Sequence, residues 1–157
     1  MPKEWLYNNG FSFLTSIDMF PPNCIGFIYE IFNFKTGKYY IGKKSLYSNT
    51  KKKLTKKELG EIETKGRKPT HKRVIKESNW KDYWGSNKQL LADIKQDGLH
   101  NFQRQILKFC YTKKQLTYWE MHYQCERNVL MDENSYNDNI LAKFFTKDLI
   151  DSLEISD

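Results

Sequence analysis

Hydrophobic and aromatic residues are concentrated in three short runs that have the length and composition of β-strands. The first run covers residues 25–34, and the second covers residues 38–43. Lys35-Thr36-Gly37 lies between them, and glycine suits the positive φ that a hairpin loop needs. The pattern therefore predicts a β-hairpin. The third run, residues 101–110, predicts another strand that can join the hairpin in an antiparallel sheet.

Two capping boxes predict the two main helices. In each box a serine or threonine precedes a glutamine by three residues, and the two side chains satisfy free backbone N–H groups at the helix start. The first helix is expected to have Ser86 as its N-cap and to end at Gly98, which suits the turn after a helix. The second should begin after Thr112 and run to Arg127. A shorter amphipathic helix is predicted over residues 142–153.

Together these elements predict an α/β (α+β) fold, with a small three-stranded antiparallel sheet flanked by helices. The 157 residues fit one domain. The N-terminal segment is too apolar for a free tail, so we expect it to pack against the domain. The expected parts are an N-terminal extension (1–23), a core (24–140) with a basic insertion (45–70) that contains a short helix (56–61), and a C-terminal helix and tail (141–157).

The positive charge is concentrated in one part of the chain. The net charge is +7, but residues 43–76 contain thirteen lysines and arginines and only three acids. This local charge of +10 leaves −3 for the remainder. A basic segment of this kind is typical of a surface that binds nucleic acid, although a solvated, flexible loop would have the same composition.

Other features exclude several classes of protein. No apolar run reaches the roughly 18 residues of a membrane span, and the N-terminus has no signal-peptide pattern. We therefore expect a cytoplasmic protein with no membrane partner. The three cysteines and three histidines show no zinc-binding spacing, so the thiols are expected to be reduced. We expect no small-molecule cofactor, and the oligomeric state stays open.

Two tyrosines of the predicted hairpin are expected to share one face of the sheet. Tyr29 and Tyr40 are eleven positions apart. If Ile31 opposes Tyr40 across the hairpin, then Tyr29 opposes Gly42. Side chains alternate between faces along a strand, so both phenols emerge on the same side. Gly42 would leave room beside Tyr29 for a backbone or a ligand.

Two lysines, Lys43 and Lys44, follow the second tyrosine directly. Two phenols and two ammonium groups around a small gap suit a phosphate better than an apolar partner. The alternative is that both tyrosines only pack in the sheet, as tyrosines in strands commonly do.

A glutamate lies on the apolar side of the second predicted helix. Glu120 shares this face with Leu116, Trp119 and Tyr123, which are spaced for one side of a helix. A carboxylate there needs a partner, because burying an unpaired charge is costly. The partner could be an arginine or lysine, or a divalent metal ion.

The segments Gly26-Phe27-Ile28-Tyr29 and Tyr40-Ile41-Gly42 resemble the two halves of the motif that names the GIY-YIG endonucleases. The eleven-residue spacing of the tyrosines is also similar to that family. The resemblance would cover residues 24–140. The run Glu77-Ser78-Asn79-Trp80-Lys81-Asp82-Tyr83-Trp84-Gly85-Ser86-Asn87 resembles the phage-encoded branch of homing and Seg-like enzymes.

The resemblance implies a divalent-metal-dependent DNA endonuclease that hydrolyses a phosphodiester bond by in-line attack of water. Tyr40 or Tyr29 would accept the proton of that water, with a phenol pKa lowered by Lys43 and Lys44. Glu120 would hold a single Mg²⁺ or Mn²⁺ ion. These roles are implied by the family and not by the spacing of the residues.

The resemblance also implies two further groups near the site. An asparagine in a Tyr-Asn pair would support the site, and Asn137 matches it, with Asn139 as second choice. The family places an arginine soon after the second tyrosine, where this chain has its insertion. Arg73 is the preferred candidate and Arg67 the alternative. This arginine would stabilise charge on the phosphate.

The basic insertion is expected to bind double-stranded DNA in the cytoplasm of a host cell if the gene belongs to a phage or mobile element. The residues assigned to phosphate or DNA contacts are Lys43, Lys44, Lys51, Lys52, Lys53 and Arg67. The main alternative is a nucleic-acid-binding protein that keeps the basic segment without the chemistry. A structural domain in which both tyrosines are packing residues is a third interpretation.

Overall fold

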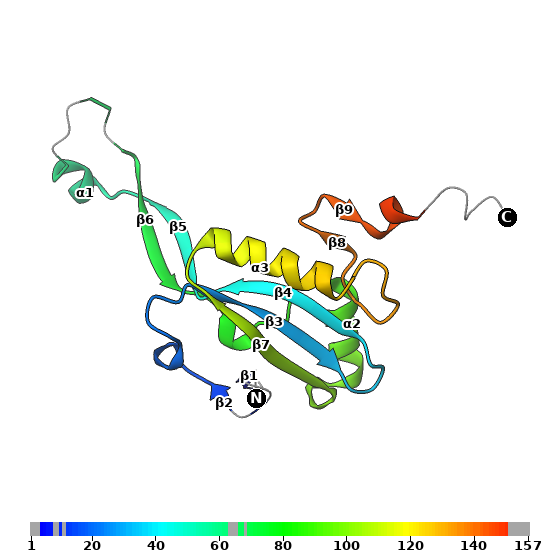
Figure 1. Cartoon of the computed structure of the whole chain (residues 1–157). Coiled ribbons are helices and arrows are strands. Elements are labelled where there is room, and N and C mark those ends of the chain that lie inside the picture. Colours follow the sequence, from blue (N-terminus) through cyan, green and yellow to red (C-terminus); the bar gives the residue numbers. More distant parts are fainter. Residues whose placement is uncertain (1–3, 8–9, 11, 63–65, 68, 151–157) are drawn as a thin grey trace.

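The computed structural model describes residues 4–7, 10, 12–62, 66–67 and 69–150. A five-stranded sheet forms the centre of the molecule, with the strand order β2-β1-β7-β3-β4 (Figure 1). The strands of this sheet are β1 (Trp5–Tyr7), β2 (Ser12–Leu14), β3 (Gly26–Asn33), β4 (Tyr39–Ser45) and β7 (Phe102–Cys110). The helices are α1 (Lys56–Gly60), α2 (Lys88–Asp97) and α3 (Lys113–Glu126), with 3₁₀ turns η1 (Ile17–Met19), η2 (Trp80–Asp82), η3 (Leu99–Asn101) and η4 (Thr146–Leu149). No helix in the described ranges is both long and apolar enough to cross a membrane.

The predicted hairpin is the middle of this sheet, and its register agrees with the expectation. Strands β3 and β4 pair antiparallel, with Tyr29 opposite Gly42 and Ile31 opposite Tyr40. Gly37, in the connecting turn, has φ +80°. Strand β7 pairs antiparallel with the other side of β3, as predicted.

The predicted three-stranded sheet is too small, because the N-terminal extension adds two strands. Strand β1 pairs parallel with β7, and β2 pairs antiparallel with β1. The sheet is therefore mixed and five-stranded. The physical reason is Trp5, which is 1% exposed and packs edge-on against Phe27 and Tyr29, so that its strand is held at the free side of β7.

Both faces of the sheet are covered. Helix α3 lies over one face, where Leu116 packs with Ile28 and Ile41 (Figure 1). The other face carries Tyr29 and is covered by a second cluster that includes Trp80, which is fully buried. The sheet therefore separates two apolar clusters, and its strand edges are the places where polar groups from both sides can meet.

The predicted start of α2 is wrong by one residue. The N-cap is Asn87, whose Oδ1 accepts a hydrogen bond from the Leu90 N–H at 2.9 Å, and not Ser86. An asparagine side chain caps a helix as well as serine does. Gly98 ends the helix with φ +86°, as the sequence suggested.

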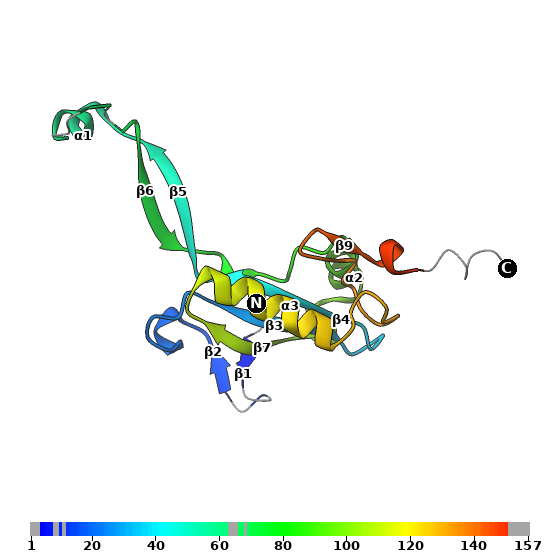
Figure 2. The ribbon, with the colours of Figure 1, turned by 45° about the horizontal axis from the view of Figure 1, so that its top comes forward.

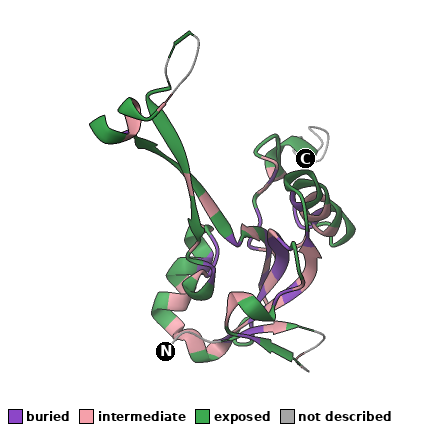
Figure 3. Cartoon of the chain, turned by 90° about the vertical axis from the view of Figure 1, so that its left-hand side faces the viewer, coloured by how far each residue is buried: buried purple, intermediate pink, exposed green. Residues whose placement is uncertain are grey.

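The basic insertion is a projecting β-hairpin and not an open loop. Strands β5 (Tyr47–Lys53) and β6 (His71–Glu77) pair antiparallel, with α1 at the far end. Figures 1 and 2 show the hairpin extending away from the sheet, and Figure 3 shows that it is mostly exposed. The short helix at residues 56–61 was predicted, whereas the strand pairing was not.

The C-terminal helix predicted over residues 142–153 is absent from the described residues of that range. Strands β8 (Asn139–Ile140) and β9 (Phe144–Phe145) form a small hairpin followed by η4. Leu141 and Ala142 have positive φ values of 56° and 52°, so they form a turn and cannot start a right-handed helix. Residues 151–157 lie outside the described residues.

The close approach of Tyr29 to the neighbouring strand depends on Gly42. A Cβ atom on Gly42 would lie 2.5 Å from the Tyr29 hydroxyl oxygen and 2.7 Å from its Cζ. Tyr29 is 1% exposed, so its ring has no open space into which it could move. The absence of a side chain at Gly42 therefore sets the position of this buried phenol.

We expect Gly42→Ala to lower the free energy of unfolding by about 1–3 kcal/mol, because the new methyl group must displace Tyr29 in a packed core. Urea denaturation followed by tryptophan fluorescence measures this. Gly60→Ala is the control, since a Cβ there meets none of the described atoms within 4 Å and should change stability by less than about 0.5 kcal/mol. Equal stability of both variants would contradict the close packing around Gly42.

Candidate active site

The site is built on the outer edge of β4, whose backbone groups find partners outside the sheet. The Tyr39 N–H donates to the Asn134 carbonyl at 2.9 Å, and the Tyr136 N–H donates to the Tyr39 carbonyl at 2.8 Å. Asn137 continues this pairing with its side chain. Its Oδ1 accepts from the Ile41 N–H at 3.0 Å, and its Nδ2 donates to the Ile41 carbonyl at 2.8 Å.

Helix α3 supplies the remaining partners of the same edge. Gln124 Nε2 donates to the Ile41 carbonyl at 3.0 Å, and the Glu120 carboxylate lies close enough to the Lys43 N–H for this group to lower the pKa of Glu120. Two side chains from α3 and one from the chain after it therefore converge on two residues of β4. The edge is closed by side chains, which protects it from pairing with another strand.

A polar pocket of about 920 Å³ opens beside this edge. Its walls come from the second half of the hairpin, the start of α2, the middle of α3 and the segment after α3. The residues that line the pocket include Tyr40, Lys43, Ser86, Glu120, Gln124 and Asn137. The structure thus brings five residues selected from the sequence to one cavity, namely Tyr40, Lys43, Glu120, Asn137 and the second-choice Asn139.

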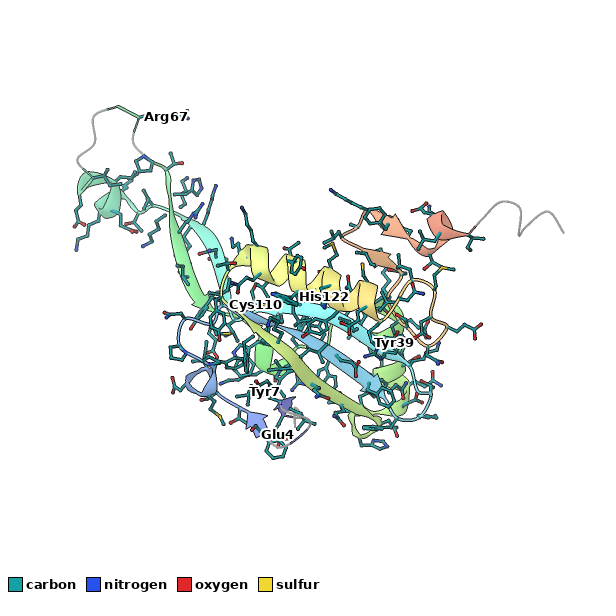
Figure 4. The ribbon with its side chains drawn as sticks, viewed as in Figure 1. Glu4, Tyr7, Tyr39, Arg67, Cys110 and His122 are labelled. Atoms are coloured by element: carbon teal, nitrogen blue, oxygen red, sulfur yellow. The ribbon has the colours of Figure 1, made fainter. Side chains whose placement is uncertain are left out.

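The two tyrosines lie on the same face of the sheet, but only one of them lines the pocket. Their ring centroids are 6.2 Å apart. Tyr40 is half-buried and faces the cavity, whereas Tyr29 is buried behind Gly42 against Tyr83. Tyr39, the neighbour of Tyr40 in β4, is labelled in Figure 4. Its hydroxyl donates to Asp132 Oδ2 at 2.7 Å, on the side of the sheet that α3 covers.

The expectation that nearby lysines lower the pKa of these phenols is wrong. Burial raises the pKa of Tyr40, and the acidic groups of Glu120 and Asp138 add to this, while a hydrogen bond with Ser86 opposes it. Burial also raises the pKa of Tyr29 well above its usual value. In the protein alone, both phenols therefore keep their protons at neutral pH.

Glu120 carries a carboxylate that is partly removed from water. Burial raises its pKa, and the positive charge and the N–H group of Lys43 lower it by less. Glu120 forms no ion pair with any residue in the described ranges. The lysine or arginine partner that was the alternative to a metal is therefore missing among these residues, and Lys43 Nζ donates instead to Thr117 Oγ1 at 3.3 Å.

The two lysines after Tyr40 point to different places. Lys43 lines the pocket and is exposed. Lys44 lies on the face of the sheet that carries Tyr29. Its Nζ donates to Asn79 Oδ1 at 2.7 Å and lies 4.3 Å from the centroid of the Tyr83 ring. Burial lowers the pKa of Lys44. Lys43 is therefore the lysine of this pair that can meet a ligand in the pocket.

Neither candidate arginine lies at the pocket. Arg73 is on β6 of the projecting hairpin, exposed and opposite Lys51. Arg67 lies at the far end of that hairpin (Figure 4). Arg73 was selected because ordered chain was expected to resume after residue 70 within the core, whereas the hairpin continues to residue 77. The described residues that line the pocket include no arginine.

Among the pocket residues that the sequence reasoning missed are Gln124 and Ser86. Gln124 is 4% exposed, and its Oε1 has no hydrogen-bond partner in the described structure. Its spacing from Leu116 and Glu120, eight and four residues, was a usable sign, because such residues share one helix face. Ser86 was interpreted only as an N-cap, and nothing in the sequence pointed to its hydrogen bond with Tyr40.

A comparison with models of protein families shows which family this chain belongs to. The family model described as "Putative endonuclease segE, GIY-YIG domain" matches residues 5–141. The chain belongs to the GIY-YIG endonuclease family. It resembles the Seg-like branch within that family, as the sequence motifs suggested, and GIY-YIG nucleases are phosphodiester hydrolases that act on nucleic acid. Searches of curated proteins and of solved structures each gave no match.

GIY-YIG nucleases generally use divalent metal ions, and the residues of this pocket fit such an ion. No group of three or more His, Cys, Asp and Glu side chains suited to a metal occurs in the described part of the chain. This argues against a zinc-type cage, which needs several protein ligands. Mg²⁺ commonly takes one or two carboxylates and keeps water and substrate phosphates as its other ligands. The partly desolvated Glu120 carboxylate, which has no ion-pair partner among the described residues, meets that requirement.

The raised pKa of Glu120 predicts a pH-dependent stability difference from Glu120→Gln in metal-free buffer. The folded protein binds the Glu120 proton more tightly than the unfolded chain does, so wild-type stability falls as pH rises between the unfolded and folded pKa values. Glutamine does not titrate. The melting temperature of Glu120→Gln should therefore match wild type at acidic pH and exceed it increasingly toward neutral pH.

Differential scanning calorimetry across this range, with EDTA, measures the difference. Glu133→Gln is the control, because it makes the same substitution at an exposed position outside the pocket. A Glu120→Gln protein that is less stable than wild type at neutral pH would mean that the carboxylate is well compensated and needs no ion.

Proposed function

We propose that this protein is a divalent-metal-dependent endonuclease that cleaves double-stranded DNA in the pocket beside β4. The observation that carries the proposal is the convergence of Tyr40, Lys43 and Glu120 on one polar cavity of a GIY-YIG domain. A phenol, an ammonium group and a carboxylate that has no ion pair within the described part of the chain are the groups needed to bind water, a phosphate and a cation. The Seg-like resemblance supports a phage or mobile-element gene whose product acts in the host cytoplasm.

Glu120 would hold the metal ion, with Mg²⁺ or Mn²⁺ as the fitting ions. When bound, such an ion supplies positive charge that polarises the phosphate and stabilises a leaving oxygen. Asn137 fixes the strand that carries Tyr40 and Lys43 through its two hydrogen bonds to Ile41. Its proposed role is therefore to hold the site in shape, and Gly42 supports the site by letting Tyr29 pack beneath it.

Tyr40 would position the attacking water and receive its proton. The phenol is protonated in the protein alone, because burial and nearby acids raise its pKa. Its oxygen can still accept a hydrogen bond from water, and it can receive the proton of that water once the phenol has lost its own proton to solvent. The pKa of the phenol would be lowered by a metal ion held by Glu120, which favours the form that accepts a proton. Tyr29 is too deeply buried to contact water and would act by supporting Tyr40.

Lys43 is the cation proposed to contact the phosphate at the site of cleavage. It lines the pocket, and its ammonium group makes one exposed hydrogen bond that a phosphate can replace. The family role of an arginine would then be filled by Lys43 or by an arginine brought by a second molecule. Lysine supplies charge without the two-pronged geometry of arginine.

A cleavage assay on supercoiled plasmid tests the proposal. Wild type should convert the plasmid in Mg²⁺ and not in EDTA. Tyr40→Phe should slow cleavage by roughly 10²–10⁴-fold, the usual contribution of a group that accepts a proton. Glu120→Ala should slow it comparably or more. Tyr39→Phe is the matched control, because its hydroxyl bonds Asp132 on the α3 side and not in the pocket.

Two results would remove the proposed roles. Equal cleavage by wild type and Glu120→Ala would exclude Glu120 as the metal ligand. Equal loss in Tyr40→Phe and Tyr39→Phe would show that any perturbation of β4 lowers activity, so that the Tyr40 hydroxyl has no special part. Circular dichroism of each variant confirms that the fold is retained.

A further inference from the structure

The hairpin β5–β6 places like charges directly opposite each other. Lys51 opposes Arg73, and Lys52 opposes Lys72. Like charges at opposed positions destabilise an antiparallel pair, whereas opposite charges or aromatic residues would stabilise it by roughly 0.2–1 kcal/mol. The hairpin therefore carries a charge arrangement that its own folding does not favour. An external anion that binds across both strands would compensate for it.

The two faces of the hairpin differ in how their charges are neutralised. On one face Lys72 forms an ion pair with Glu58 of α1, which holds the short helix against β6. On the other face lie Lys51, Lys53, His71 and Arg73, because side chains alternate along each strand. The lysines and the arginine of this second face form no ion pair with any residue that the structure describes. We call this second face the cationic face.

The hairpin is exposed along its length but fixed at its base. Ile75, next to Arg73 on the cationic face, is 68% exposed, so the hairpin does not pack on the core there. At its base Leu46 is fully buried, and the Ser78 N–H donates to the Leu46 carbonyl at 2.8 Å. The Ser78 hydroxyl also donates to the Ser45 carbonyl at 2.6 Å. The hairpin β5–β6, called the arm below, thus leaves the domain directly from β4, the strand that carries the candidate site (Figure 2).

We propose that the cationic face of β5–β6 enters the major groove of duplex DNA beside the cleavage site. This goes beyond the proposed chemistry, although it rests on DNA as the proposed substrate. A two-stranded ribbon has the right shape, since the major groove is about 12 Å wide and accepts β-ribbons as well as helices. Seven residues per strand span roughly 23 Å, about two-thirds of a turn of B-DNA.

The cationic face carries groups for the two kinds of contact that a protein makes in a DNA groove, those to phosphates and those to base edges. Lys51 and Lys53 suit the phosphates along the groove, and Arg73 has the paired N–H geometry that matches a guanine edge. Asn49, opposite Ile75, adds an amide that can recognise adenine. The double-stranded RNA major groove is too narrow and deep for such a ribbon, so duplex DNA is the preferred partner.

The short connection to β4 places the contact close to the cut. Eight residues separate Lys43 at the pocket from Lys51 on the arm, and an extended chain of that length spans at most about 26–29 Å. Base pairs are spaced about 3.4 Å apart, so the groove contact should lie within about one helical turn of the cleaved bond.

Binding to a duplex in EDTA tests the proposal without requiring cleavage, so its failure is separable from failure of the proposed chemistry. We compare wild type with two double variants. Lys51→Gln with Arg73→Gln removes two charges from the cationic face. Lys52→Gln with Lys76→Gln removes two charges from the opposite face of the same strands, so this proposal takes Lys52 out of the set of DNA contacts suggested by the sequence. The duplex includes the mapped cleavage site, or a plasmid-derived fragment if cleavage is absent.

The cationic-face variant should bind DNA at least about 10-fold more weakly. The slope of the logarithm of its binding constant against the logarithm of salt concentration should become shallower by the equivalent of about two phosphate contacts. The opposite-face variant should lose less than about 3-fold. Equal losses would overturn the proposal, because they would show a diffuse electrostatic effect. Unchanged binding by both would also overturn it, since the arm would not touch DNA. Removing a repulsive pair should not unfold the arm, and circular dichroism checks this.

Dimethyl sulfate footprinting identifies the groove. Wild type should protect guanine N7, which faces the major groove, in one block within about a turn of the cut, and the cationic-face variant should lose that block. Protection of adenine N3 in the minor groove alone, or competition by duplex RNA as effective as that by DNA, would contradict insertion of the ribbon into the DNA major groove.

Discussion

The outer edge of β4 is the constraint on which the rest of the site depends. An edge strand has backbone N–H and C=O groups with no partner in the sheet, and leaving such a group buried and unpaired costs about 1–3 kcal/mol. Asn137 and Gln124 form hydrogen bonds with the backbone of Ile41, and the Glu120 carboxylate lies close to the N–H of Lys43, which lowers the pKa of Glu120. The same side chains line the pocket. Closing the edge therefore also brings the polar groups of the proposed site together.

Part of this arrangement follows from local patterns in the sequence. The turn at Gly37 sets the hairpin register, and the register places Tyr29 over Gly42. Helical spacing puts Glu120 on a partly buried face. The approach of Ser86 to Tyr40 at the pocket could not be predicted, because it brings separate elements together and depends on where α2 begins. The fourth and fifth strands of the sheet escaped prediction for a related reason, since strands of three residues are defined by their partners more than by their own sequence.

The insertion shows the limit of composition as a guide. Its charge correctly marks an exposed basic segment, but charge alone does not distinguish a loop from a hairpin. The strand pairing separates Lys51 and Arg73 from Lys52 onto different faces, which no count of lysines reveals. It also explains why Arg73 is far along the arm and not beside Tyr40. The protein thus combines a pocket built around one strand edge with a basic arm that continues from the same strand.

Hydrogen–deuterium exchange of the Ile41 and Lys43 amides, followed by NMR, tests the edge arrangement most directly. In the wild type both amides should exchange slowly although β4 is an edge strand. Glu120→Ala should speed exchange at Lys43 and leave Ile41 protected, whereas Asn137→Ala should do the reverse. Fast exchange of the Lys43 amide in the wild type, or no response of that amide to Glu120→Ala, would contradict the account.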